Sequence, residues 1–144
     1  MKEIYFACAI TGGRDHAHVY PKIVGYIKDA GMHVLSEIFA STSVKSSQGL
    51  GAQHGMTPAE IWEWDMGWIR AADAIIAEVT QPSLGVGYEI ATAYTLGKPV
   101  LALYHPLPER KLSSMIAGSP NVTVFEYNNV AETEAAIKEF LAGL

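Results

Sequence analysis

The stretch DAIIAEVTQPSLGVGYEIATAYTLGKPVLALYH, residues 73–105, decides the fold. It begins and ends with short apolar runs, 73–79 and 99–105, which are typical of buried strands. Between them, Pro82 and two glycines lead into a helical segment that Gly97 would end. Because strand, helix and strand follow one another, the two strands are predicted to lie parallel in a sheet whose faces are covered by helices.

The same alternation continues through the rest of the chain, with strands predicted at 3–9, 33–39 and 121–127 and helices at 15–30, 57–71 and 131–144. Thr57 is a predicted N-cap, followed by Pro58 at the first helical position and by Glu60, which would complete a capping box. Five strands separated by helices predict an α/β fold, a flavodoxin- or Rossmann-like three-layer sandwich with a five-stranded parallel sheet in the order 2-1-3-4-5. The length of 144 residues suits one domain, 1–144.

The composition argues against several classes of partner. Charged residues make up 17% and hydrophobic residues 49% of the chain, the balance of an ordinary globular protein. The net charge of −5 argues against broad binding to nucleic acid or to anionic membranes, although a nest of backbone N–H groups can still hold one phosphate. The single Cys8 fits a reducing compartment, and no targeting or membrane-spanning segment is visible, so we expect a cytoplasmic protein.

The unusual segments of the chain are predicted to meet at one edge of the sheet. In the order 2-1-3-4-5, ligands bind at the carboxyl ends of the first and third strands. TGGR (11–14) follows the first strand and TQPSLGVGYE (80–89) follows the third. Residues 40–56 are rich in Ser and Gly and have no periodicity, so they are expected to form a lid, a binding loop or a mobile segment.

Glu89 is the first candidate for catalysis. Gly85 and Gly87 before it permit a tight turn and a close approach of the backbone to a ligand. Free N–H groups at a helix start favour an anion, so Glu89 is expected to stay ionised near neutral pH, which suits a nucleophile. The alternative is that Glu89 only complements the helix dipole, because acids are common in first turns.

Asp65 is the second candidate. In the predicted helix 57–71, an apolar stripe surrounds it, formed by Ile61, Trp68, Ile69 and Ala72. A carboxylate in such a stripe costs free energy unless it is paired or used. The alternative is a position at the edge of the stripe, where Asp65 would bond a backbone group or Arg70. Trp64 and Trp68 either line a pocket for a flat base or belong to the core.

The remaining candidates have two interpretations each. Tyr5 lies inside the first strand and is by default a core residue whose hydroxyl needs a partner. Ser83 is a helix cap or a phosphate contact, and the pair Gly12–Gly13 is a tight turn or an anion-binding nest. The five histidines show no ligand spacing, and neither G-x-G-x-x-G after the first strand nor a P-loop pattern is present. We therefore expect no metal site and no cofactor.

Three motifs together resemble a known family: YFACAITGGR (5–14), EWDMGWIRAADAIIAEVTQPSLGVGYEIATAYTLGKPVLALY (63–104) and LSSMIAG (112–118). In that order and spacing they are similar to the 2′-deoxynucleoside 5′-monophosphate N-glycosidases, which are themselves related to nucleoside 2-deoxyribosyltransferases. The resemblance covers most of residues 3–118, and AEVTQPSLGVGYE is its most specific part.

The resemblance implies hydrolysis of the bond between base and deoxyribose in a nucleoside monophosphate. Glu89 matches the family's nucleophile, which would attack the anomeric carbon and give a glycosyl-enzyme that water opens. Asp65 matches an acid that assists the leaving base or the incoming water. Tyr5 matches a tyrosine that holds the nucleophile in place.

For the phosphate, the resemblance implies a site shared between two subunits. Ser83 and Gly85 match positions that hold the 5′-phosphate. Ser113 matches a serine that reaches the phosphate of the neighbouring subunit's substrate, so a homodimer is expected. Further substrate contacts are expected from the loop after the first strand, formed by Ala9, Ile10, Thr11, Gly12 and Gly13.

One departure from the family leaves alternatives open. Nucleotide-cleaving members carry a serine and an arginine where this chain has Ala9 and Thr11, and the missing charge-assisted hydrogen bond is worth about 1.5–3 kcal/mol. Thr11, Arg14 and the nest Gly12–Gly13 are expected to replace part of it. The alternatives are base exchange as in a nucleoside 2-deoxyribosyltransferase, hydrolysis of ribonucleotides or unphosphorylated nucleosides, and a non-catalytic nucleotide-binding module on the same scaffold.

Overall fold

Five parallel strands form the central sheet of the molecule. The computed structural model describes residues 1–44 and 55–144. Its strands are β1 (Glu3–Ala7), β2 (His33–Val34), β3 (Ala74–Glu78), β4 (Val100–Tyr104) and β5 (Val122–Glu126). They pair in the order β2-β1-β3-β4-β5 and every pair is parallel, which confirms the predicted order. All residues of β3 and β4 are buried, as expected for strands covered on both faces.

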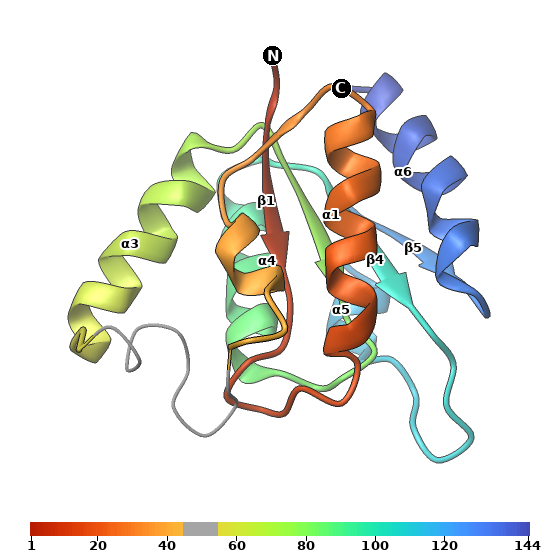
Figure 1. Cartoon of the computed structure of the whole chain (residues 1–144), viewed down its shortest axis with the longest axis horizontal. Coiled ribbons are helices and arrows are strands. Elements are labelled where there is room, and N and C mark those ends of the chain that lie inside the picture. The colour runs from red at the N-terminus through yellow and green to blue at the C-terminus, as the bar shows by residue number, and fades with distance from the viewer. Residues whose placement is uncertain (45–54) are drawn as a thin grey trace.

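Helices cover both faces of this sheet (Figure 1). On one face α1 (Tyr20–Asp29) packs against α6 (Thr133–Ala142). On the other face lie α4 (Leu84–Thr95) and α5 (Ser114–Ala117), while α3 (Pro58–Ala71) contacts β1. The predicted three-layer arrangement is confirmed. Because the helices that follow β1 and β3 lie on opposite faces, the carboxyl ends of these two strands form the topological switch point.

Local sequence explains where the helices begin and end. Thr57 Oγ1 accepts a hydrogen bond from the Glu60 N–H at 3.2 Å, and Pro58 is the first residue of α3, as predicted. The Glu60 carboxylate accepts the Thr57 hydroxyl at 3.0 Å, whereas a capping box would have it accept from the Thr57 N–H. Gly31 and Gly97 have φ values of +84° and +68° and end α1 and α4, a conformation that favours glycine.

The predicted strand 33–39 is shorter than expected. Only His33–Val34 pairs with β1, and the chain then forms the 3-10 turn η2 (Glu37–Ala40). The buried Ser36 explains the difference, because its Oγ accepts from the Phe6 N–H and donates to the Phe6 carbonyl, both at 2.8 Å. A side chain thus takes the place of the next ladder bonds of the sheet.

Two predicted helices begin later than expected. Residues 15–30 form the 3-10 turn η1 (Ala17–Val19) before α1, and the C-terminal segment begins with η3 (Val130–Glu132) before α6. Of the predicted loop 40–56, residues 45–54 lie outside the described residues. Within 1–44 and 55–144, no helix is long and apolar enough to cross a membrane.

Candidate active site

The loops after β1 and β3 contact each other at the carboxyl edge of the sheet. Gln81 Nε2 donates a hydrogen bond to the Gly12 carbonyl oxygen at 3.1 Å. A Cβ on Gly12 would lie 2.9 Å from the Pro82 carbonyl oxygen, so a side chain does not fit there. Gly13 has a φ of +127°, which residues with side chains rarely adopt. The two glycines therefore serve the contact between these loops.

Ser83 caps the helix that carries Glu89. Its Oγ accepts a hydrogen bond from the Val86 N–H at 3.3 Å. Gly85 and Gly87 lie inside α4, so they do not form the tight turn that the sequence predicted for them. A Cβ on Gly87 would meet no described atom within 4 Å. The two glycines therefore leave the backbone near the start of α4 accessible to a ligand or a second chain. This accessibility costs stability, about 1 kcal/mol for each helical glycine relative to alanine.

Tyr5, Asp65 and Glu89 come together from β1, α3 and α4. Burial, and then the charges of Glu89 and Asp65, raise the pKa of Tyr5, so its hydroxyl faces both carboxyls. The Tyr5 hydroxyl, Asp65 Oδ1 and Glu89 Oε2 are buried, and each lacks a hydrogen-bond partner among the described residues. We call Asp65 and Glu89 the carboxyl pair. The pair thus comes from two helices and lies close to Tyr5 of β1.

Burial raises the pKa of both members of the carboxyl pair. It raises the pKa of Asp65 to about 6. Burial, and then the charge of Asp65, raises the pKa of Glu89 to about 8, while the Tyr5 hydroxyl partly lowers it. The prediction that Glu89 stays ionised at neutral pH is therefore wrong. Glu89 lies beyond the first turn of α4, where the helix dipole is weak, and its charged neighbour is another acid.

This electrostatic arrangement suits acid–base and nucleophilic chemistry. Between about pH 6 and pH 8 the carboxyl pair holds one proton. One carboxyl can then supply a proton while the other supplies a negative charge. The alternative for Glu89 was to complement the helix dipole, but Glu89 is not in the first turn of α4. The alternative for Asp65 was a bond to a backbone group or to Arg70. Asp65 Oδ1 has no such partner among the described residues, and the Arg70 guanidinium lies over the Trp62 ring, 5.7 Å from its centroid.

Aromatic side chains of α3 flank the carboxyl pair. The Trp64 and Trp68 rings lie 4.6 Å apart, and Phe39 meets Trp68 edge-on at 5.6 Å between centroids. Both tryptophans are half-buried and pack against the core. Of the two alternatives, the core role is therefore the one observed for both.

Trp62 and Tyr88 were not among the sequence candidates. Trp62 Nε1 donates a hydrogen bond to Tyr88 Oη at 3.2 Å, although both side chains are largely exposed. Trp62 lies one turn before Asp65 in α3, and Tyr88 directly precedes Glu89 in α4. This contact therefore joins the two helices beside the carboxyl pair. The signal in the sequence that could have identified Trp62 and Tyr88 was their position, within one helical turn of Asp65 and Glu89.

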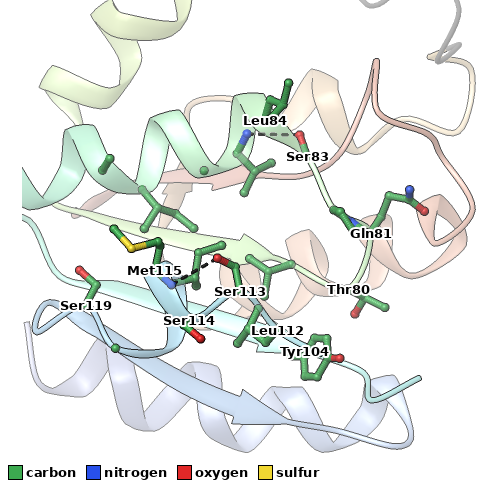
Figure 2. A pocket seen from close by; sticks show the side chains of 18 of the residues that line it. Thr80, Gln81, Ser83, Leu84, Tyr104, Leu112, Ser113, Ser114, Met115 and Ser119 are labelled. Carbon is green, nitrogen blue, oxygen red and sulfur yellow. Dashed lines mark hydrogen bonds between the residues drawn. The ribbon is translucent and has the colours of Figure 1, made fainter. Parts of the chain in front are cut away.

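A pocket of about 1000 Å³ lies on the other flank of α4, between this helix and α5 (Figure 2). We call it the α4–α5 groove. Gly12, Ser83 and Ser113 line it, and Ser113 caps α5 by accepting from the Met115 N–H at 3.3 Å. The groove thus brings together three of the residues expected to bind substrate, whereas Gly85 and the rest of the loop 9–13 do not line it. The residues expected to be catalytic do not line this groove.

Sequence comparison decides the family. The chain matches the model of the nucleoside 2-deoxyribosyltransferase family over residues 4–121. It belongs to this family. A 5-hydroxymethyl-dUMP N-hydrolase of Rattus norvegicus is 40% identical over 131 residues, which are 91% of this chain and 78% of the relative. A putative 2′-deoxynucleoside 5′-phosphate N-hydrolase 1 of Syntrophotalea carbinolica is 36% identical over 140 residues, 97% of this chain and 94% of the relative. These relatives place the chain in the N-glycosidase class of enzymes.

Solved structures share the nucleoside 2-deoxyribosyltransferase fold. The CMP N-glycosidase BcmB of Clostridium botulinum superimposes with a TM-score of 0.67 at 18% identity, covering 96% of this chain and 99% of that chain. A 2-deoxyribosyltransferase from Bacillus psychrosaccharolyticus gives a TM-score of 0.62 at 18% identity, covering 94% and 95%. At these identities the likeness establishes the fold.

The loop after β1 is the place where this family member departs from the expected phosphate contacts. Ala9 is fully buried, and its carbonyl accepts from Arg14 Nη1 at 3.1 Å. The Arg14 guanidinium also donates to the Phe39 and Ser41 carbonyls at 3.1 and 2.7 Å. The expectation that Arg14 helps to replace a lost phosphate contact is not supported, because these bonds hold its guanidinium against the backbone. Ile10 is partly buried against the core, and Thr11 is exposed.

Proposed function

We propose that the chain hydrolyses the N-glycosidic bond of 2′-deoxynucleoside 5′-monophosphates to the free base and 2-deoxyribose 5-phosphate. The observation that carries this proposal is the carboxyl pair, two acids with buried carboxyl oxygens close to the Tyr5 hydroxyl. Buried acids without a counter-charge reduce stability, so their presence at a ligand-binding edge of the fold indicates use in catalysis. The relatives named N-hydrolases support cleavage of the same bond.

Glu89 is the proposed nucleophile. Its carboxylate oxygen forms a bond to C1′ of the deoxyribose while the bond between C1′ and the base nitrogen breaks, and the electron pair leaves with the base. Asp65 donates a proton to the departing base. Water then attacks C1′, returns a proton to Asp65 and releases Glu89, so both carboxyls regain their initial states.

Tyr5 is proposed to determine which of the two carboxyls carries the proton. The mechanism needs Glu89 ionised and Asp65 protonated, whereas the higher pKa of Glu89 favours the proton on Glu89. The nearby Tyr5 hydroxyl lowers the pKa of Glu89. We propose that bound sugar brings this hydroxyl into a hydrogen bond with Glu89 and so shifts the proton towards Asp65.

The 5′-phosphate is proposed to lie at the start of α4. Free N–H groups at a helix N-terminus attract an anion, and Ser83 Oγ and the bare backbone of Gly85 are available beside them. The loop that carries Gly12 lies against the same segment. These groups would hold the phosphate through hydrogen bonds without a cationic side chain.

A second copy of the chain is proposed to cover the α4–α5 groove. Leu84 and Met115 stand at this groove with exposed fractions of 97% and 84%. Large exposed apolar side chains around a pocket are typical of an interface. Ser113 lines the same groove, so in a dimer it would approach the phosphate held by Ser83 of the other subunit.

Cleavage of unphosphorylated nucleosides, or transfer of the deoxyribose to a second base, is the second candidate function. The loop after β1 favours it, because Ala9 is buried and Arg14 is held by backbone carbonyls. A weakly held phosphate would reduce the preference for nucleotides over nucleosides.

A panel of substrates tests these proposals. Deoxynucleoside monophosphates, ribonucleotides and nucleosides are incubated with the enzyme, with and without an acceptor base, and free base and new nucleosides are separated by chromatography. We expect free base from deoxynucleotides, loss of this activity in Glu89→Gln, and full activity in the control Glu134→Gln on α6. A new nucleoside in the presence of acceptor base would establish transfer. No base release from any deoxynucleotide at high enzyme concentration would refute the proposed function.

A further inference from the structure

Four residues form a closed hydrogen-bonded ring, through side-chain and backbone groups, at the start of the loop that follows β3. Glu78 is the last residue of β3 and is only 1% exposed. Its Oε1 accepts from the Thr80 N–H at 2.6 Å, and its Oε2 accepts from the Thr80 hydroxyl at 3.2 Å and from the Tyr127 hydroxyl. His105 closes the ring, donating through its N–H to Thr80 Oγ1 at 2.8 Å and through Nδ1 to the Tyr127 carbonyl at 2.9 Å. We call this arrangement the Glu78 ring.

The Glu78 ring joins three strands at the edge where substrate is proposed to bind. Glu78 ends β3, His105 follows β4 and Tyr127 follows β5. Burial raises the pKa of Glu78, and hydrogen bonds from Tyr127 and Thr80 lower it. A buried acid with this many donors costs free energy to desolvate and is rarely the most stable choice for a core position. Stability alone is therefore a poor explanation of the ring.

The ring fixes a segment that holds both loops of the proposed phosphate site. Thr80 is tied at its N–H and at its hydroxyl, the latter as donor and acceptor at once. The next two residues contact the loop after β1, Gln81 through its bond to the Gly12 carbonyl and Pro82 through close packing against Gly12. Ser83 then caps α4. Rotation of Thr80 would move all of these groups together.

We propose that Glu78 is a positioning residue that aligns the loops after β1 and β3 for the 5′-phosphate, acting through Thr80 and supported by Tyr127. This inference rests on the proposed function, because it assigns the ring to the phosphate end of that site. Neither Glu78 nor Tyr127 lines the α4–α5 groove. Their effect on substrate is therefore indirect, through the placement of Gly12 and Ser83.

The test removes one hydroxyl from the ring and compares nucleotide with nucleoside. Tyr127→Phe keeps the aromatic side chain and deletes the hydroxyl that donates to Glu78. Tyr26→Phe is the matched control, because it makes the same substitution on α1, outside the Glu78 ring. We expect Tyr127→Phe to lower the ratio of kcat/KM for a deoxynucleotide to kcat/KM for its nucleoside about tenfold, mainly through KM, because displacement of Gly12 and Ser83 would lose about one hydrogen bond to the charged phosphate. Glu78→Gln, which keeps an acceptor for the Thr80 N–H, should retain more of this ratio than Glu78→Ala.

A second readout separates this inference from the proposed function. Amide spectra of the unliganded proteins should show the Gly12 and Gly13 signals displaced in Tyr127→Phe and unmoved in Tyr26→Phe, with binding of inorganic phosphate weakened only in the former. A folded Tyr127→Phe with unchanged loop signals and an unchanged kinetic ratio would overturn the inference while the function stands. If the wild-type chain releases no base, the proposed function fails. In that case the amide spectra and phosphate binding still test the inference, and Tyr127→Phe with unchanged loop signals and unchanged phosphate binding would overturn it.

Discussion

Replacing Glu89 by glutamine should stabilise the protein at neutral and alkaline pH while removing its activity. In the folded chain burial and Asp65 raise the pKa of Glu89 from 4.5 to about 8. The folded state therefore holds this proton more tightly than the unfolded state does. The stability that this proton on Glu89 contributes to the folded state is fully present below pH 4.5 and is lost as the pH rises through about 8. Glutamine does not titrate, so the variant keeps its stability across this range.

The size of the gain follows from the shift in pKa. At about 1.4 kcal/mol per pKa unit, a rise from 4.5 to about 8 gives an upper limit of about 5 kcal/mol above pH 8, and about 3 kcal/mol at pH 7. Since Glu89 is only half-buried as a residue, solvent screening reduces this, and we expect about 2 kcal/mol at pH 8. In a domain of 144 residues that corresponds to about 7 °C in Tm.

Urea unfolding at a series of pH values between 4 and 9 measures this difference. Wild type and Glu89→Gln should have similar free energies of unfolding at pH 4 and diverge as the pH rises, with the variant the more stable. Glu134→Gln, at an exposed glutamate of α6 paired with Lys138, serves as the control and should show no such divergence. A constant difference between wild type and Glu89→Gln across the series, or a variant less stable at pH 8, would refute the assignment of Glu89 as a buried acid without a counter-charge.

Three further predictions concern the proton, the loops and the interface. Activity should follow a bell-shaped pH profile with limbs near pH 6 and pH 8. Tyr5→Phe should move the alkaline limb upward and lower the maximum, because it removes the hydroxyl that lowers the pKa of Glu89. Stopped assays across pH 5–10 measure both effects. Gly12→Ala should reduce both stability and nucleotide cleavage, since its Cβ would lie 2.9 Å from a carbonyl oxygen, and unfolding and kinetic measurements check both. Met115→Glu should prevent self-association in sedimentation velocity, and a wild type that is monomeric at every concentration would contradict the proposed dimer.

The sheet was predictable because its strands are continuous apolar runs separated by helical segments. The length of β2 was not, since pairing ends where the Ser36 side chain bonds the backbone of Phe6, a contact between residues 30 positions apart. The start of α3 was predictable from Thr57 and Pro58, because a cap depends only on neighbours in the chain.

The identity of the candidate acids was predictable, and their protonation was not. The apolar stripe of α3 indicated Asp65, and the glycine-rich helix start indicated Glu89. Only the fold shows that the two acids lie close to each other and to Tyr5. For the same reason the sequence suggested Arg14 as a phosphate ligand, whereas the carbonyls that hold it include those of residues far along the chain. Long-range polar contacts of this kind decide what a candidate residue can do.

The bond between Glu89 and the sugar is the most direct measure of the proposed mechanism. The enzyme is mixed with a deoxynucleoside monophosphate, quenched in acid during the first turnovers, and analysed by intact mass and by peptide mapping. The mechanism predicts 2-deoxyribose 5-phosphate attached to the peptide that contains Glu89, and no adduct in Glu89→Gln. Release of stoichiometric base while that peptide stays unmodified, or an adduct on a different residue, would contradict it.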